Sequence, residues 1–581
     1  MLYINLLRIT YFVCLIFYST WKIHKVIVII GIAVLAFFLF LTILLSILFF
    51  NSYHQEVTKK AYNNFDLIIS YSLYSDVLIE GGNAVDAAIA VLICLGVVNP
   101  MSSGLGGGHF MTIYNASTGR CTAIDAREVA PYRASKDMFD KNPKEAQKGW
   151  KAIGVPGELH GLRTAYERFG GNVSWKRLFQ PSIRMLNIGV PVSQALGATL
   201  KVNFKVLKSS ILLALILDSQ KFKDVYKFGD IISNTLKFHY SDTLGYLADA
   251  ADPIQEFYNG QMTDLFLAEF EENGGIMTRD DFRNYSSIVH EQEDIIVTEL
   301  KNYTMYGPPP PSSSAVTQNF TFITSNTKFY KFAYAQRNRL GDSAFVKDAL
   351  QIARNITSDK FVEMIKQKIT RTPHPLNYYT NMYQPLMDKG TTNVAIIDQD
   401  GNAVAVTTTV NLFFGSQVAS ESTGIIWNSQ MDDFSQPNGT NYYGYPPSPV
   451  NFIEPRKRPL SSISPLIILN KGTKKVEMVI GCAGGSQIIS TVSSIVSKVL
   501  LLGWDLKTAF DSPRIHNQLL PQGTVYEEKF PETYIRKLQK RGHNLTTILG
   551  IGEATGIYNH NGRIYAMSDF RKGVDSYPAG F

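Results

Sequence analysis

Hydrophobic side chains dominate every turn of the chain from Val26 to Phe50, and no charged residue interrupts the run. A helix of this length would span about 37 Å, enough to cross a bilayer with some tilt. Three Lys or Arg residues precede the run, as is typical of the cytoplasmic side of a membrane helix. The pattern predicts a cytoplasmic tail over 1–25, a transmembrane helix over 26–50 and an extracellular chain from residue 51 onward.

Farther along, the pattern changes to short elements of globular type. Residues 82–98 are apolar on nearly every side, which predicts a helix at the centre of a core. A glycine-rich turn over 102–108 precedes a strand-like stretch over 109–114. Residues 150–290 show helical periodicity with polar faces. Four consecutive prolines and three serines within 307–314 predict a loop or surface turn.

A β-rich pattern begins near residue 391. Residues 393–397 and 402–409 predict two strands, and the sequence Asp-Gln-Asp-Gly over 398–401 is typical of a hairpin turn between them. Later, a strand is expected over 476–480, a tight glycine loop over 481–485 and a helix over 487–502.

Composition narrows the possible functions. The 581 residues carry a net charge of +7 without a concentrated basic run after residue 60, which disfavours nucleic-acid binding. Of the four cysteines, Cys94 and Cys121 could pair, and no metal-binding spacing is present. Eight Asn-x-Ser/Thr sequons follow the apolar run and support an external location. They are Asn115, Asn172, Asn284, Asn302, Asn319, Asn355, Asn438 and Asn544.

A candidate nucleophile stands immediately before the first strand of the predicted hairpin, in Gly390-Thr391. A threonine hydroxyl becomes reactive when a base lies within hydrogen-bond reach, and its own α-amino group can serve if the preceding bond has been cut. That amine has a pKa of roughly 8 and can accept a proton near neutral pH. Taken alone, Gly390-Thr391 is a weak signal, because a Gly-Thr pair before a strand is common and the end of a loop is the favoured interpretation.

Several segments, in the same order, resemble the γ-glutamyltransferase family. They are GGNAVDAAIA (81–90), GLGGGHFMTIYN (104–115), DAREVAP (125–131), VPGELHGL (155–162), TTTVNLFFGS (407–416), NSQMDDFS (428–435), RPLSSISP (458–465), GCAGGSQI (481–488) and DFRKGVDSYPAGF (569–581). The resemblance covers roughly residues 80–581, and together with the apolar N-terminal run it indicates an animal-type, membrane-anchored member. It implies an α+β fold, the N-terminal-nucleophile hydrolase αββα sandwich. It also implies self-cleavage between Gly390 and Thr391, into a large subunit (51–390) and a small subunit (391–581) that stay together.

The resemblance also implies roles for single residues. Thr391 would be the nucleophile, and Thr409 the second threonine that hydrogen-bonds it. Gly484 and Gly485 would form the oxyanion hole, although a glycine turn before a helix could also bind phosphate. The α-carboxylate of the substrate would be held by Arg127, Ser461 and Ser462, and its α-ammonium by Asn411, Gln430 and Asp433. Without the family, Asp432 and Asp433 could be a solvated acidic pair or part of a metal site.

These roles imply a plasma-membrane, single-pass type II enzyme that transfers the γ-glutamyl group of glutathione or related compounds. Acceptors would be water, an amino acid or a dipeptide, and neither a metal nor an organic cofactor is expected. Two alternatives stay open, a catalytically inactive homologue with a binding role and a related amide acylase. The chain also departs from the family, with Asn393 where His is usual and Ser70 where many animal members have a cysteine that pairs with the equivalent of Cys94.

Overall fold

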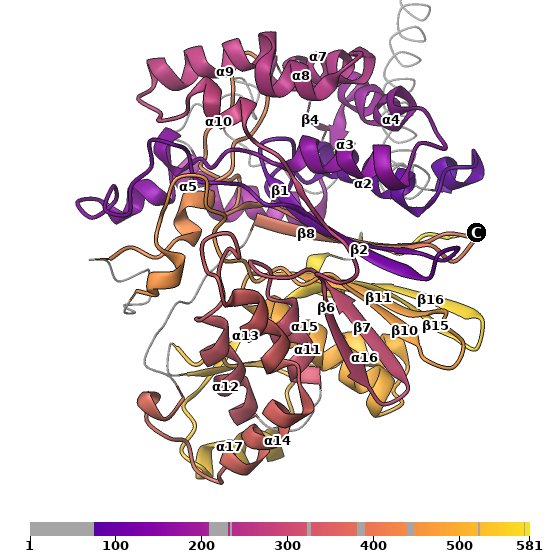
Figure 1. Ribbon diagram of the computed structural model, residues 1–581, viewed down its shortest axis with the longest axis vertical. Helices are drawn as coiled ribbons and strands as arrows, with labels where there is room; N and C mark the ends of the chain where they lie inside the picture. The colour runs from indigo at the N-terminus through magenta and orange to yellow at the C-terminus, as the bar shows by residue number, and fades with distance from the viewer. Residues whose placement is uncertain are drawn as a thin grey trace, which may run out of the picture. The chain divides into compact units, whose positions relative to one another are not determined.

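Two β-sheets lie face to face in the computed structural model, and helices cover the outer side of each sheet (Figure 1). The structure describes residues 75–207, 231–232, 235–321, 327–379, 390–437, 447–520, 523–573 and 576–580, which all belong to the unit Asp66–Phe581. This arrangement confirms the predicted α+β sandwich. The predicted membrane helix, 26–50, lies outside these residues, and no helix within them is long and apolar enough to cross a bilayer.

The first sheet has five strands, and every neighbouring pair is antiparallel. Its order is β5 (Ile288–His290), β2 (Arg120–Ala126), β1 (Gly108–Asn115), β9 (Ala403–Asn411) and β8 (Gly390–Ile397). The turn between β8 and β9 is the predicted hairpin, closed by backbone bonds from Asp398 N to Asn402 O and from Gly401 N to Asp398 O. The Asp398 carboxylate also accepts from the backbone of Asp400 and Asn402. Both strands extend two or three residues beyond the predicted bounds, so that Thr391 lies within β8.

The second sheet has six antiparallel strands. Its order is β16 (Arg563–Ser568), β15 (Glu553–His560), β11 (Val476–Ala483), β10 (Leu466–Asn470), β7 (Tyr303–Gly307) and β6 (Ile296–Leu300). Two smaller sheets complete the β structure, one of β3 (Val190–Pro191) and β4 (Ile231–Ile232), the other of β12 (Ile515–His516), β13 (Thr524–Glu527) and β14 (Leu545–Ile548).

The helices confirm the predicted helical stretches. Those before residue 284 are α2 (Ala84–Val98), α3 (Glu158–Phe169), α4 (Trp175–Ile188), α5 (Gln194–Leu207), α7 (Thr235–Asp249), α8 (Pro253–Asn259), α9 (Gln261–Glu272) and α10 (Arg279–Arg283). Those after it are α11 (Ser314–Thr321), α12 (Thr327–Arg337), α13 (Ala349–Ile356), α14 (Asp359–Lys368), α15 (Gln487–Val496), α16 (Leu506–Asp511) and α17 (Glu532–Lys540). The predicted central helix is α2, which is buried along almost its whole length. In Figure 1, α2 and α3 lie against the first sheet, and α11 and α15 lie on the side of the second.

The alternation of side chains along strand β9 determines which face of the sheet carries the two candidate catalytic threonines. Val404 and Val406 belong to the core that β9 shares with α2, whereas Ala403 and Ala405 belong to the core between the two sheets. Because successive side chains of a strand point to opposite faces, Thr407 and Thr409 also face the second sheet. Thr391 is registered opposite Thr409 and shares its face.

The proline-rich segment is a loop between β7 and α11, as predicted, but it does not lie at the surface, because residues 307–321 are all buried. Its prolines carry no N–H that needs a partner. Serine side chains donate to its buried backbone carbonyls, as when Ser312 Oγ donates to Pro308 O at 2.7 Å. Cys94 and Cys121 do not pair and are free, buried thiols. Burial raises the pKa of Cys94 to about 12, so it behaves as a small apolar residue.

Candidate active site

The hairpin of β8 and β9 brings Thr391 and Thr409 together at the edge of the first sheet. Their hydroxyl oxygens lie 3.0 Å apart, and both side chains are buried. Thr409 Oγ1 also donates to Gly390 O at 2.7 Å and accepts from Asn411 N at 2.9 Å. A hydroxyl has one proton to donate, so the Thr391 hydroxyl is the donor in its bond with Thr409. The Thr409 hydroxyl therefore polarises the carbonyl before Thr391 while it orients the Thr391 oxygen.

Gly390 has no space for a side chain. A Cβ at this position would lie 2.1 Å from Leu412 O and 2.9 Å from Met101 O. The backbone of residues 412–414 is fixed in turn, since Phe414 N donates to Met101 O at 3.0 Å. The tight fit holds the Gly390–Thr391 peptide in one place beside Thr409.

A buried ion pair joins two predicted substrate-binding residues that are far apart in sequence. The guanidinium of Arg127, which directly follows β2, donates to Asp433 Oδ2, and Gln430 Nε2 donates to the same oxygen. Arg127 Nε also reaches Pro459 O at 3.5 Å. Asp433 is buried, so the interpretation as a solvated acidic pair is wrong for this residue. Separating two buried charges is costly unless other charges replace each partner.

Two amide oxygens next to this pair lack hydrogen-bond partners among the described residues. They are Asn411 Oδ1 and Gln430 Oε1, and both side chains are buried. The other atom of the Asn411 amide is used, because Nδ2 donates to Ser429 O at 2.8 Å. These two oxygens and the Asp433 carboxylate can accept hydrogen bonds from a ligand, and an ammonium group has three N–H donors to offer.

The two predicted serines act as acceptors within the protein, which leaves their protons available. Ser461 Oγ accepts from Ile463 N at 3.1 Å, and Ser462 Oγ accepts from a guanidinium nitrogen of Arg337 at 3.1 Å. Both serines are fully buried. Their segment is tied to the proline-rich segment, since Ser461 N donates to Pro311 O at 2.9 Å.

The glycine loop lies at the end of β11, before α15. Gly484 and Gly485 have φ of +115° and +58°, in the region that L side chains rarely adopt. Strand β11 faces the hairpin of the first sheet, because a Cβ on Gly481 would lie 3.3 Å from Asn393 and from Thr407. Both glycines therefore follow directly on a strand that packs against the strand of Thr391.

Hydrogen bonds connect Thr391 through Thr409 and Asn411 to Ser429, and the next residue, Gln430, is hydrogen-bonded through Asp433 to Arg127. Sequence reasoning missed three members of this region. Asn428 donates to Gly106 O and Gly154 O at 2.8 Å and fixes the segment before Gln430. Glu128 lies beside Arg127, with Oε2 at 3.7 Å from the guanidinium, and burial raises its pKa to about 8. The third is Arg337, which donates to Ser462 Oγ. An acid next to the predicted arginine was the available signal for Glu128.

Asn393, at the position where the family usually has His, is engaged in the sandwich. Its Nδ2 donates to Thr555 Oγ1 on β15 of the second sheet. The amide therefore lies between the two sheets. Ser70 lies outside the described residues.

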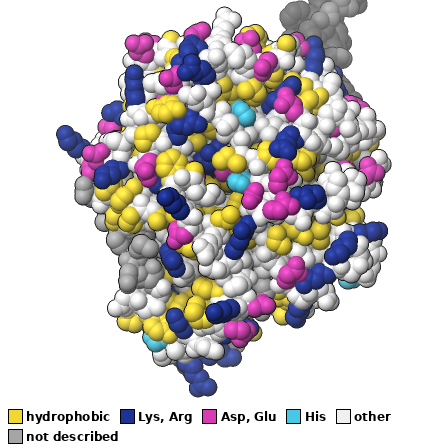
Figure 2. All heavy atoms as spheres, in the orientation of Figure 1, with side chains coloured by type: hydrophobic (Ala, Val, Ile, Leu, Met, Phe, Trp, Pro, Cys, Tyr) yellow, Lys and Arg dark blue, Asp and Glu magenta, His cyan; other side chains and the backbone are white. Residues whose placement is uncertain are grey.

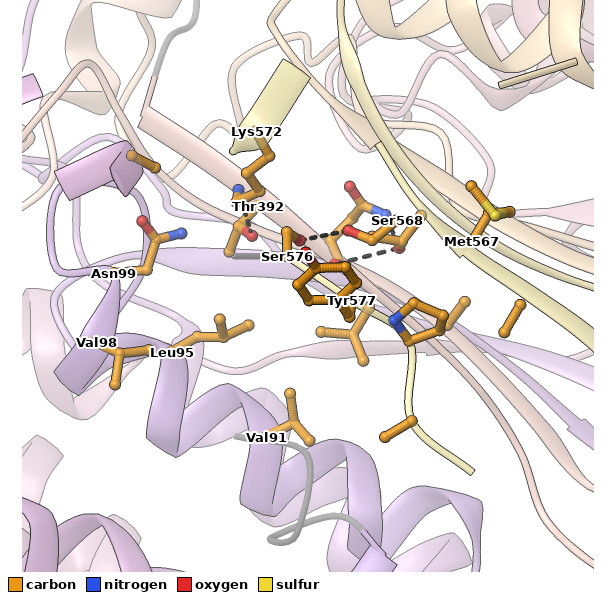
Figure 3. A pocket seen from close by; sticks show the side chains of 18 of the residues that line it. Val91, Leu95, Val98, Asn99, Thr392, Met567, Ser568, Lys572, Ser576 and Tyr577 are labelled. Atoms are coloured by element: carbon orange, nitrogen blue, oxygen red, sulfur yellow. Dashed lines mark hydrogen bonds between the residues drawn. The ribbon is translucent and has the colours of Figure 1, made fainter. Parts of the chain in front are cut away.

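An apolar cavity of about 260 Å³ lies beside β8 and is separate from the ion pair (Figure 3). Helix α2 contributes Val91, Leu95 and Val98 to its wall, and the C-terminal segment contributes Lys572 and Tyr577. Lys572 Nζ donates to Thr392 Oγ1 at 3.0 Å, so the end of the chain contacts the residue after Thr391.

No group of three or more His, Cys, Asp or Glu side chains within the described parts of the chain could hold a metal ion. Burial, with the nearby charge of Asp433, raises the pKa of Asp432 to about 7. On the face drawn in Figure 2, Lys and Arg side chains are interspersed with Asp and Glu.

The sequons differ in accessibility. Asn172, Asn284, Asn302, Asn355 and Asn544 are exposed, Asn115 is half-buried, and Asn438 lies outside the described residues. Asn319 is only 1% exposed, and its Nδ2 donates to Ile356 O. Its prediction as a glycan acceptor is wrong for the folded protein, because a glycan needs a surface nitrogen.

Comparison with known proteins places this sandwich in a class. The structure of cephalosporin acylase from Bacillus halodurans aligns with a TM-score of 0.73 and 21% identity, over 86% of this chain and 92% of that chain. At this identity the likeness concerns the fold, which agrees with the predicted N-terminal-nucleophile hydrolase class. The family model described as gamma-glutamyltranspeptidase matches residues 72–579, and the chain belongs to this family.

Relatives of nearly full length support the same assignment. Scoloptoxin SSD14 of Scolopendra dehaani is 39% identical over 526 residues, covering 85% of this chain and 88% of the relative. Glutathione hydrolase 2 of Arabidopsis thaliana is 34% identical over 545 residues, covering 87% and 91%. Glutathione hydrolase 5 proenzyme of Homo sapiens is 32% identical over 545 residues, covering 85% and 89%. The family predicted from the sequence motifs is confirmed.

Proposed function

We propose that the chain is a self-processing γ-glutamyltransferase and glutathione hydrolase, with Thr391 as its nucleophile. The observation that carries this proposal is the geometry around Gly390, where one hydroxyl, that of Thr409, contacts both the carbonyl before Thr391 and the Thr391 oxygen. Family membership supplies the reaction class, and relatives named glutathione hydrolases supply glutathione as the expected substrate.

Processing would begin with attack of Thr391 Oγ1 on the Gly390 carbonyl carbon. The Thr409 hydroxyl would stabilise the negative charge that develops on Gly390 O, and the Thr391 proton would pass to the departing peptide nitrogen. The product is an ester between Gly390 and Thr391 Oγ1. Water would hydrolyse this ester, leaving a Gly390 carboxylate and a free α-amino group on Thr391.

The free amine would then act as the base for the second reaction. It would take the proton of Thr391 Oγ1 as that oxygen attacks the γ-carbonyl carbon of the substrate, and the leaving amine would depart protonated. Gly484 and Gly485 would offer backbone N–H groups to the oxyanion. The γ-glutamyl ester would transfer to water, to an amino acid or to a dipeptide.

Selectivity for a γ-glutamyl group would come from the buried charges. Arg127 and Asp433 contact each other, and a zwitterionic head group could replace that contact by two charge-matched ones. The carboxylate would receive bonds from Arg127, Ser461 and Ser462. The ammonium would donate to Asp433 and to the unpaired oxygens of Asn411 and Gln430. A glutaryl acylase would need no such acceptors, which disfavours that alternative.

The experiment is to express residues 51–581 in a secretory host and sequence the N-termini of the purified fragments. We expect a small fragment that begins at Thr391 and activity toward a γ-glutamyl anilide, with little toward the matching glutaryl anilide. A single uncut chain without activity would overturn the proposal in favour of an inactive homologue. Equal rates with both anilides would favour the acylase.

The same protein would be anchored in the plasma membrane by residues 26–50, with its catalytic part outside. The charge-free run, the preceding cations and the exposed sequons support this placement. Full-length protein in cultured animal cells should stay with membranes after alkaline washing, and protease added to intact cells should degrade it. Release by the wash, or complete protection from protease, would contradict this placement.

A further inference from the structure

Helix α12 places a buried arginine against the serines of the site. Arg337, the last residue of α12, is 1% exposed. Its Nε donates to Ser313 Oγ at 3.1 Å, and one terminal nitrogen donates to Ser462 Oγ at 3.1 Å. Arg337 and Ser313 precede the predicted cut, whereas Ser462 follows it. The contact therefore joins the two subunits at the predicted carboxylate site.

The chemistry of the two groups fixes the direction of this hydrogen bond. A guanidinium can only donate, so Ser462 Oγ must accept and its own proton must point elsewhere. No acceptor for that proton lies at hydrogen-bond distance among the described residues. Ser313 differs, because its hydroxyl accepts from Arg337 and donates to Ser461 O at 2.5 Å. Of the two hydroxyls bound by Arg337, only that of Ser462 has a proton left for a ligand.

The neighbouring serine is oriented in another way. Ser461 Oγ accepts from Ile463 N, a backbone group two residues along the same chain. Its orientation depends on local geometry, whereas that of Ser462 depends on a side chain of the large subunit. A change at Arg337 should therefore affect one of the two serines selectively.

We propose that Arg337 is a positioning residue for substrate specificity. It holds the Ser462 hydroxyl as a donor toward the α-carboxylate, and it adds a buried positive charge at this end of the site. The inference rests on the proposed function and deepens it, since it assigns a determinant of the preference for a free α-carboxylate. The alternative role is a structural tie between the subunits without influence on this preference.

The test compares two substrates, γ-glutamyl-p-nitroanilide and its α-carboxamide analogue. The quantity measured is the ratio of kcat/KM for the carboxylate over that for the carboxamide, in the processed wild-type ectodomain and in Arg337→Met. We expect the ratio to fall about tenfold or more in the variant, mainly through a higher KM for the carboxylate substrate. Loss of one hydrogen bond to a charged group has an effect of this size.

Three further variants isolate the cause. Arg337→Lys keeps the charge and should give an intermediate ratio. Ser462→Ala should lower the ratio. In the Ser462→Ala background, Arg337→Lys should lower the ratio by a smaller factor than it does in the wild type. Tyr334→Phe is the matched control, because Tyr334 lies one turn earlier on α12 and its hydroxyl donates to Ser486 O instead. Its ratio should equal that of the wild type.

The outcomes are separable. Equal losses with both substrates in Arg337→Met would assign Arg337 to a structural role and overturn the inference. If Arg337→Met stays uncut on a gel, Arg337→Lys decides by the same criterion. A wild-type protein inactive toward both substrates would refute the proposed function itself, whatever the variants show.

Discussion

Replacing Thr409 by valine should slow self-cleavage sharply while leaving the fold in place. The two side chains have nearly the same shape, so the change removes a hydroxyl rather than volume. That hydroxyl donates to Gly390 O at 2.7 Å, accepts from Asn411 N at 2.9 Å and lies 3.0 Å from Thr391 Oγ1. The variant therefore loses the group that would stabilise the oxyanion and orient the nucleophile during processing.

The size of the effect follows from these contacts. Removing one oxyanion donor typically slows a reaction about 100- to 1000-fold. Leaving the buried Asn411 N–H without a partner should also lower the free energy of unfolding by about 1–3 kcal/mol. Rate and stability can be separated, because the first is read from the appearance of the fragments over time on a gel and the second from thermal unfolding of the uncut chain.

Thr407 supplies a matched control on the same face of β9. Its Oγ1 is buried and has no hydrogen-bond partner among the described residues. Thr407→Val removes a hydroxyl of the same kind without breaking a bond, and we expect normal cleavage and equal or higher stability. Cleavage of Thr409→Val at the wild-type rate would refute the role of Thr409. Equal slowing in both valine variants would show that the strand, and not the Thr409 hydroxyl, sets the rate.

Three other predictions concern charge and modification. Asp433→Asn should raise KM for a γ-glutamyl anilide about 30-fold or more, because the ammonium of the substrate loses the carboxylate proposed to receive it, whereas cleavage at Thr391 should persist on a gel. Glu128→Gln should be progressively more stable than the wild type as pH rises from about 5 to 8 in thermal unfolding. In the unfolded wild type the Glu128 carboxyl ionises near pH 4.5, whereas burial raises its pKa in the folded protein to about 8. The free energy of unfolding of the wild type therefore falls as pH rises through this window, and that of the variant lacks this loss. Asn319→Gln should leave the glycan mass of the secreted protein unchanged, because Asn319 is buried. The control is Asn172→Gln, which should reduce the glycan mass when that exposed sequon carries a glycan. A glycan found on Asn319 by peptide mapping would contradict the buried placement.

Local pattern was enough to predict the hairpin that carries the nucleophile. The Val- and Thr-rich sequence of β9, the Asp-Gln-Asp-Gly turn and the Gly-Thr pair near the start of β8 are all contiguous signals, and the structure registers Thr391 opposite Thr409 as the turn requires. The glycine loop was predicted for a similar reason, since a strand, a glycine cluster and a helix follow each other directly.

Contacts between distant segments could not be derived in this way. Arg127 and Asp433 are 306 residues apart, and only the family resemblance placed them in one site. The proline-rich segment was predicted to be a loop or surface turn because prolines and serines are typical of both, yet it is buried, and Ser313 donates to Ser461 O. Asn319 has the sequence of a sequon, but its side chain is buried and donates to Ile356 O on α13. Periodicity and spacing carry no information about these neighbours.

The topology explains why cleavage at Gly390 would not separate the subunits. Strand β1, before the cut, pairs with β9, after it, from Gly108 opposite Thr409 to Tyr114 opposite Ala403. In the second sheet, β7 pairs with β10 across the same division. Each sheet therefore contains strands of both subunits, and separation would expose the edges of two sheets and the core between them. Because Arg127 lies before the cut and Asp433 after it, the ion pair of the site spans the same division, and the site is complete only while both sheets hold.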